Sequence, residues 1–132
     1  MKREKVVIDS DIIAEHLITN EQESELRRIS REKFCYTTVF NAMELFAAAR
    51  TVKEKRAVRM AMDALKVLGV NPKSAERMGP MLAGNAGMSA SLIAGVCRES
   101  GLPLLTMHPE RYAGIRGITV IAVPRQRSAR RR

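Results

Sequence analysis

The sequence predicts an α/β protein whose core is a parallel sheet of about four to five strands. Short apolar runs rich in β-branched residues, at 5–9, 34–38, 102–106 and 118–123, are typical of buried strands, and 69–72 offers one more very short strand. Segments with apolar residues at helical spacing separate these runs along the chain. Strands that alternate with helices favour a parallel sheet between two helical layers, which is an α/β/α sandwich.

The connecting segments are expected to be helical, and most carry a start or stop signal. They cover 11–18, 20–33, 39–50, 51–69, 73–84 and 88–101. Asn20 and Ser89 are the expected N-caps of two of them. Thr51 and Glu54 have the spacing of a capping box, and Gly69 is the expected stop of the same helix.

Length and charge indicate one domain with a basic extension. The chain has 132 residues, which we divide into a domain at 1–123 and a tail at 124–132. The formal net charge is +9, and the tail holds five arginines and no acid. We expect the tail to be disordered and to bind RNA phosphates through Arg125, Arg127 and Arg130. No apolar run reaches the roughly 18 residues that span a bilayer, so we expect a cytoplasmic protein without a membrane partner.

Polar residues at the strand ends are the candidates for chemistry, because ligands of such sheets bind outside the carboxyl ends of the strands. These candidates are Asp9, Ser10, Asp11, Thr106 and His108. Glu44 is the only acid in the apolar helix 39–49, where an unpaired buried carboxylate is costly. Clustered carboxylates repel one another, and Mg²⁺ or Mn²⁺ relieves that repulsion and activates water for attack on a phosphoryl group. Two simpler interpretations stay open: Glu44 lies on an exposed stripe, and Asp9 only caps the first helix.

Other classes of site have little support in the sequence. No GxGxxG follows the first strand, and neither GxxxxGK[ST] nor GxSxG occurs. His16 and His108 are the only histidines, which is too few for a zinc motif of the HExxH kind. With three Phe and two Tyr, a platform of aromatic side chains for base stacking is not expected.

Three blocks in order resemble a PIN domain, most closely the small VapC-type toxins of prokaryotic toxin–antitoxin pairs. "VVIDSDII" is similar to the opening strand of that family, with its Asp and the small polar residue after it. "YTTVFNAMELFAAA" is similar to its strand and helix with a Glu, and "GMSASLIAGVCRESGLPLLTMHPERYAGIRGITVI" to its closing block. The resemblance covers about residues 5–123. It implies a PIN-like α/β/α sandwich and a Mg²⁺- or Mn²⁺-dependent endoribonuclease.

The resemblance also implies roles for single residues. Asp9 and Glu44 would be metal-binding carboxylates, and Thr106 would be the hydroxyl that orients a ligand or water. Ser10 would be a hydroxyl that contacts these ligands and not the metal itself, and Asp11 would reach the site through water. These five residues keep the pattern of the family.

Two other positions depart from it. The third acid of the family falls at Ala90, and the fourth acid or amide falls at His108. Imidazole can still bind a metal or a water, whereas the alanine side chain offers no ligand. The resemblance thus implies that Ala90 occupies a catalytic, metal-binding position without a group that can bind metal. We therefore expect an endoribonuclease that is impaired as written. The intact surroundings of Ala90 favour the interpretation that an Asp was replaced there, over natural loss.

The resemblance further implies partners. Arg111 and Arg116 would contact the RNA backbone, and Arg111 with Tyr112 stands where the family often has a pair ending in Phe. An antitoxin protein is expected as a partner, and a homodimer through the helical face that carries Met60. The first alternative is a non-catalytic RNA-binding or scaffold protein on a degenerate PIN fold. A phosphoacceptor-type regulator is a weaker alternative, because no lysine follows the strand 102–106.

Overall fold

A single five-stranded parallel sheet organises the molecule, as the sequence predicted. The computed structural model describes residues 3–19, 22–84 and 86–124. Its strands are β1 (Lys5–Ile8), β2 (Phe34–Thr38), β3 (Lys66–Leu68), β4 (Leu104–Thr106) and β5 (Val120–Ala122), in the spatial order β3–β2–β1–β4–β5. The chain therefore builds outward from β1 in one direction and then in the other. The resulting switch point lies between β1 and β4, where ligands of open α/β sheets bind.

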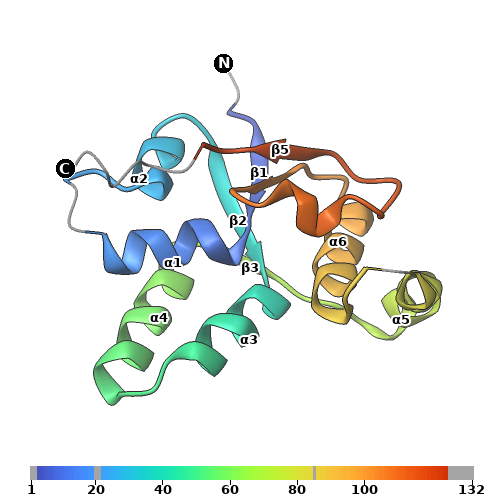
Figure 1. Ribbon diagram of the computed structural model, residues 1–132, viewed down its shortest axis with the longest axis horizontal. Coiled ribbons are helices and arrows are strands. Elements are labelled where there is room, and N and C mark those ends of the chain that lie inside the picture. The colour runs from blue at the N-terminus through green and yellow to red at the C-terminus, as the bar shows by residue number, and fades with distance from the viewer. Residues whose placement is uncertain (1–2, 20–21, 85, 125–132) are drawn as a thin grey trace.

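Helices cover both faces of the sheet (Figure 1). The α-helices are α1 (Ser10–Ile18), α2 (Glu25–Ser30), α3 (Val39–Ala48), α4 (Val52–Ala64), α5 (Pro72–Met78) and α6 (Met88–Ser100). Two 3₁₀ turns, η1 (Gly79–Ala83) and η2 (Pro109–Tyr112), complete the described elements.

The alternation of side chains along β1 divides the core in two. Val6 and Ile8 point into a cluster formed with α1, α2, α3 and α4. Val7 points into a second cluster, on the opposite face, that includes Ile93 of α6 and Tyr112 of η2. All three β1 side chains are essentially inaccessible to solvent, because a central parallel strand is buried on both faces. This position of β1 fixes the place of the residue that follows it.

The start of α3 is fixed by a capping box that the sequence analysis did not identify. Thr38 Oγ1 accepts hydrogen bonds from the backbone N–H groups of Phe40 and Asn41, and Asn41 Oδ1 accepts from the backbone N–H of Thr38. The predicted box of Thr51 and Glu54 at α4 is confirmed. At the other end of the chain, α6 ends at Gly101, whose φ of 70° lies in the left-handed region that glycine adopts without strain.

Two expected helices are shorter in the structure. The segment 20–33 forms a helix only over Glu25–Ser30, with Ser24 and not Asn20 as its N-cap, and Asn20 lies outside the described residues. The segment 51–69 ends its helix at Ala64, and 66–68 is β3. No strand forms at 69–72, because Pro72 already begins α5. Pairing with the open edge of β2 stabilises β3, and this pairing is a tertiary effect that a helical pattern does not reveal.

The predicted N-cap of α6 is also wrong. Gly87 occupies the N-cap position, and no side chain caps the helix. Ser89 lies inside the first turn, and its hydroxyl donates to Glu44 instead. None of the described helices is long and apolar enough to cross a bilayer. The expected RNA-binding tail residues Arg125, Arg127 and Arg130 lie outside the described residues.

Candidate functional site

Acidic side chains from distant parts of the chain meet at the carboxyl end of β1. Asp9 directly follows β1, Glu44 lies one turn into α3, and Thr106 ends the neighbouring strand β4. Because β1, β2 and β4 run parallel, their carboxyl ends lie at the same edge of the sheet. The structure thus brings together the two carboxylates and the hydroxyl that the sequence analysis selected.

Asp9 is the most deeply buried carboxylate, with 1% of its surface exposed. Its Oδ1 accepts hydrogen bonds from the backbone N–H of Ser10 at 2.8 Å and from Asn41 Nδ2 at 2.9 Å. Its Oδ2 accepts from Thr106 Oγ1 at 2.8 Å and from the Tyr112 hydroxyl at 2.9 Å. Burial raises the pKa of Asp9 above its ordinary value, and the negative charge of Asp11 raises it further. Asp9 caps α1 and also joins the cluster, so the two interpretations of its role hold together.

Glu44 faces the same edge and is not on an exposed stripe. Its Oε1 accepts a hydrogen bond from Ser10 Oγ at 2.6 Å, and its Oε2 accepts from Ser89 Oγ at 2.7 Å and from Arg111. Burial alone would raise the pKa of Glu44, but these three donors together hold the pKa below its ordinary value. Glu44 is therefore held as a carboxylate that is already well supplied with donors.

A second group of contacts adjoins the first through Thr106. Asp11 Oδ2 lies 3.0 Å from Thr106 Oγ1, accepts from the backbone N–H of Met107 at 3.0 Å, and lies 2.8 Å from His108 Nδ1. The Thr106 hydroxyl has one proton and two facing carboxylates, Asp9 and Asp11, so it donates to only one of them at a time. Asp11 contacts Thr106 directly, and the expectation that it reaches the site through water stays a prediction.

Ala90, the expected third acid, lies in the core beside this cluster. It is the third residue of α6 and is 3% exposed. Its methyl group packs with Val7, Leu104 and Tyr112 in the cluster on that face of the sheet. The preceding residue, Ser89, contributes the only side chain from the start of α6 that donates to Glu44 among the described residues.

The side chains at this edge do not fit a divalent cation. Mg²⁺ needs several oxygen ligands with free lone pairs in near-octahedral positions. All four carboxylate oxygens of Asp9 and Glu44 already accept hydrogen bonds, and Ala90 supplies no ligand. Within the described part of the chain, no group of three or more His, Cys, Asp or Glu side chains is arranged to hold a metal ion. A guanidinium, that of Arg111, already lies against both carboxylates.

Two residues of the site were missed at the sequence level. Asn41 is fully buried, and its amide joins Asp9 at 2.9 Å to Ser10 Oγ at 2.8 Å. The signal for Asn41 was present, because it lies three residues after Thr38 and three before Glu44 on the same side of a helix. The sequence contains no comparable signal for the bond from Tyr112 to Asp9.

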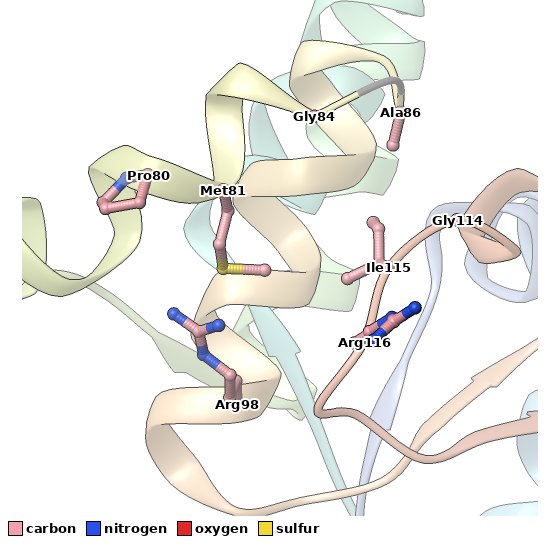
Figure 2. A pocket seen from close by; sticks show the side chains of 8 residues that line it. All are labelled: Pro80, Met81, Gly84, Ala86, Arg98, Gly114, Ile115 and Arg116. Atoms are coloured by element: carbon pink, nitrogen blue, oxygen red, sulfur yellow. The ribbon is translucent and has the colours of Figure 1, made fainter.

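The two arginines expected to contact RNA lie in different environments. Arg111 joins the acid cluster. Arg116 lines a separate pocket of about 270 Å³, where it lies across from Arg98, with Met81 and Ile115 between them (Figure 2). The other lining residues are Pro80, Gly84, Ala86 and Gly114. None of the acid-cluster residues lines this pocket, and RNA contact by either arginine stays a prediction.

A five-stranded parallel sheet between helical layers, with carboxylates at the end of its central strand, is the PIN-like class of fold. No family model and no curated protein matches the chain in sequence. Solved structures match in fold. VapBC2 from Rickettsia felis, bound to a DNA fragment from their promoter, matches with a TM-score of 0.76 at 11% identity, over 90% of this chain and 98% of that chain.

Two further structures give the same result. DNA-bound VapBC from Salmonella typhimurium matches with a TM-score of 0.74 at 17% identity, over 92% of this chain and 98% of that chain. A toxin–antitoxin complex from Klebsiella pneumoniae matches with a TM-score of 0.68 at 19% identity, over 89% and 96%. The chain therefore has the fold of proteins in VapBC toxin–antitoxin complexes, and the predicted PIN-like sandwich is confirmed.

Proposed function

We propose that this chain is the toxin subunit of a toxin–antitoxin pair, a cytoplasmic protein built on an endoribonuclease scaffold whose cleavage centre is impaired as written. One observation carries the proposal: Asp9, Glu44 and Thr106 meet at the switch point of a PIN-like sheet. Buried carboxylates gathered at such an edge are costly for folding alone, and a function at that edge explains why they are there.

The impairment follows from what stands beside the two carboxylates. Ala90 removes the third acid that the family resemblance implies, and Arg111 neutralises part of the remaining charge. Both features disfavour binding of the Mg²⁺ or Mn²⁺ on which, by the resemblance, cleavage would depend. The hypothesis that Ala90 replaces an Asp accounts for the first feature and not for the second.

RNA is the proposed ligand because the chain is strongly basic and most of its excess charge lies at one end. The five tail arginines supply more than half of the formal net charge of +9. A basic arm attracts nucleic acid phosphates whatever the sequence of the nucleic acid. The alternative function, non-catalytic RNA binding or scaffolding, is favoured by the ion pair between Arg111 and Glu44.

The proposed antitoxin would dock on the helical layer formed by α1, α3 and α4. Large apolar side chains lie exposed there, with Ile18 at 78% and Met43 at 57% of their surface. A groove of about 210 Å³ runs beside Ile18 and is lined on other sides by Ala48 and Val58. An amphipathic segment laid into such a groove is a common form of recognition. Met60, at 65% exposed on α4, is the proposed contact of a homodimer.

RNA cleavage with Mg²⁺ or Mn²⁺ tests the proposal. Four purified proteins are compared: the chain as written, Ala90→Asp, Ala90→Asp with Arg111→Gln, and that double variant with Glu44→Gln added. We expect no cleavage by the chain as written. Ala90→Asp alone should not cleave, because Arg111 still lies against both carboxylates. Cleavage should appear once Arg111 is also replaced, because both obstacles are then removed.

The Glu44→Gln variant guards against a contaminating ribonuclease, because it keeps the other two changes and removes one carboxylate. Cutting that survives Glu44→Gln would not come from this site. If no variant cleaves any RNA while the chain as written still binds RNA, the non-catalytic alternative replaces the proposal.

A further inference from the structure

Arg111 makes the contacts at the acid cluster that a bound cation would make. Its guanidinium donates to Glu44 Oε2 through one terminal nitrogen, and the other lies 3.5 Å from Asp9 Oδ1. The three side chains come from η2, α3 and the end of β1. One positive group therefore bridges two carboxylates that are 35 residues apart in the chain and would otherwise repel each other.

The backbone around Arg111 is firmly held. Tyr112, the next residue, is 2% exposed, and its hydroxyl donates to Asp9 Oδ2 at 2.9 Å. The Arg111 guanidinium carbon lies 5.4 Å from the centre of the Tyr112 ring, a cation–π distance. The backbone N–H of Arg111 donates to the His108 carbonyl at 3.0 Å. Arg111 is thus directed at the carboxylates by its neighbour and by its own turn.

The carboxylate oxygens of Asp9 and Glu44 also accept hydrogen bonds from other side chains. Ser10 and Ser89 donate to Glu44, while Asn41 and Thr106 donate to Asp9. A divalent ion would have to displace several of these donors and also come to lie beside the Arg111 charge. The positive charges of the ion and of the Arg111 guanidinium would repel each other. This repulsion is strong where solvent is largely excluded, and Asp9 is almost fully buried.

Asp11 does not supply the missing ligand. Its Oδ2 is turned toward Thr106, the backbone N–H of Met107 and His108. Its Oδ1 is buried without a hydrogen-bond partner among the described residues. Asp11 therefore does not form a metal-binding group of three carboxylates with Asp9 and Glu44 among the described residues.

We propose that Arg111 is an internal counter-cation that takes the place of a divalent metal between Asp9 and Glu44, so that the chain as written does not bind Mg²⁺ or Mn²⁺ at this cluster. The proposal goes beyond the proposed function and does not depend on it, because it holds whether the chain binds RNA, an antitoxin or neither. It predicts that metal binding is recovered by replacing the arginine, and not by supplying the third acid alone.

Mn²⁺ binding to the full chain tests this proposal, followed by electron paramagnetic resonance of free Mn²⁺ and by calorimetry. The variants are Glu44→Gln, Ala90→Asp, Arg111→Gln, Arg111→Gln with Ala90→Asp, and Arg111→Gln with Glu44→Gln. Arg59→Gln is the matched control, because Arg59 is an exposed arginine on α4 outside the cluster. Circular dichroism and urea unfolding check that each protein is folded.

We expect no saturable binding by the chain as written or by Arg59→Gln up to about 5 mM Mn²⁺, a concentration that detects weak oxygen-ligand sites. Arg111→Gln should bind Mn²⁺, the addition of Ala90→Asp should tighten binding at least tenfold, and the addition of Glu44→Gln should abolish it. Saturable binding by the chain as written that Glu44→Gln removes would overturn the proposal. A folded Arg111→Gln protein that binds no better than Arg59→Gln would overturn it too. If Arg111→Gln does not fold, the titration of the chain as written and of Arg111→Lys decides, and binding by either refutes the counter-cation.

Discussion

Replacing Tyr112 by Phe removes a single hydroxyl from the core and is expected to destabilise the protein measurably. The hydroxyl donates to Asp9 Oδ2 at 2.9 Å, and Tyr112 and Asp9 are 2% and 1% exposed. Phe keeps the ring that packs against Val7 and lies under Arg111, so the change isolates the hydrogen bond.

The size of the effect follows from the partner of the hydroxyl. A hydrogen bond to a charged group contributes about 1.5–3 kcal/mol, and burial of both partners prevents water from replacing the lost donor. Because Thr106 still donates to the same Asp9 oxygen, we expect a loss near the lower end, about 1.5–2 kcal/mol. For a domain of this size, that loss lowers the melting temperature by roughly 5–10 °C. Urea unfolding followed by circular dichroism measures it directly.

Tyr36→Phe is the control for this experiment. Tyr36 lies half-buried in β2, and its hydroxyl makes no hydrogen bond to the described residues. The control should change the free energy of unfolding by less than about 0.5 kcal/mol. Equal losses of stability for the two variants would show that the hydrogen bond from Tyr112 to Asp9 contributes nothing to the free energy of unfolding, and the reasoning would then be wrong.

Three further outcomes are expected. Gly95→Ala should lower stability by about 1 kcal/mol, because the added Cβ would lie 2.6 Å from Met78 Cε; Met78→Ala in the same chain should remove that penalty, and a double-mutant cycle by urea unfolding measures the coupling. The pKa of Glu44 is lowered in the folded state, so its ionised side chain stabilises the protein above the unfolded-state pKa, and this stabilisation is lost as the pH falls through the folded-state pKa. Glu44→Gln should therefore reduce the loss of stability below pH 4.5, which unfolding curves between pH 3 and 5 measure. If the variant and the unchanged chain lose stability equally with falling pH, the lowered pKa of Glu44 is contradicted. Deletion of 124–132 removes five arginines and should weaken RNA binding. The slope of log binding constant against log salt concentration, measured by fluorescence anisotropy, should become shallower by about three units. An unaltered slope would show that the tail does not contact phosphates.

The strands that were predicted well are those whose own residues determine them. Apart from Cys35, the residues of the runs VVI and FCYTT are β-branched or aromatic, and both runs lie at the centre of the sheet. The sequence analysis therefore placed β1 to within one residue at its end and β2 at its observed bounds. Residues 66–68 were assigned to a helix because Lys66 continues a helical pattern without a breaker. The strand exists there because Tyr36 and Thr37 of β2 present an open edge, and only the folded structure supplies that edge.

The site divides in the same way. Asp9 follows β1 and Thr106 ends the parallel strand β4. This fact alone brings them to one edge of the sheet, where Thr106 Oγ1 lies 2.8 Å from Asp9 Oδ2. The position of Arg111 depends on the 3₁₀ turn η2 and on the buried Tyr112. The sequence indicates a loop or short helical turn over 108–117, but nothing in it indicates that Tyr112 is buried and bonded to Asp9. The charge of Arg111 suggested phosphate as its partner, whereas the fold provides two carboxylates within the chain itself.

Ala90→Asp on its own tests whether the missing third acid alone prevents metal binding, or whether Arg111 prevents it as well. Ala90 is 3% exposed and packs with Val7 and Leu104, so a carboxylate there is buried among apolar side chains, and Arg111 is already paired with Glu44. A buried charge without its own partner costs several kcal/mol, and we expect the variant to lose about 3 kcal/mol of stability in the presence of a chelator. With Arg111 in place, 5–10 mM Mg²⁺ should not restore that loss, since a ligand regains about 3 kcal/mol only at roughly a hundredfold excess or more over its dissociation constant. A full recovery of the melting temperature in Mg²⁺ would show that the guanidinium moves aside for the metal, and that Ala90 alone had disabled the site.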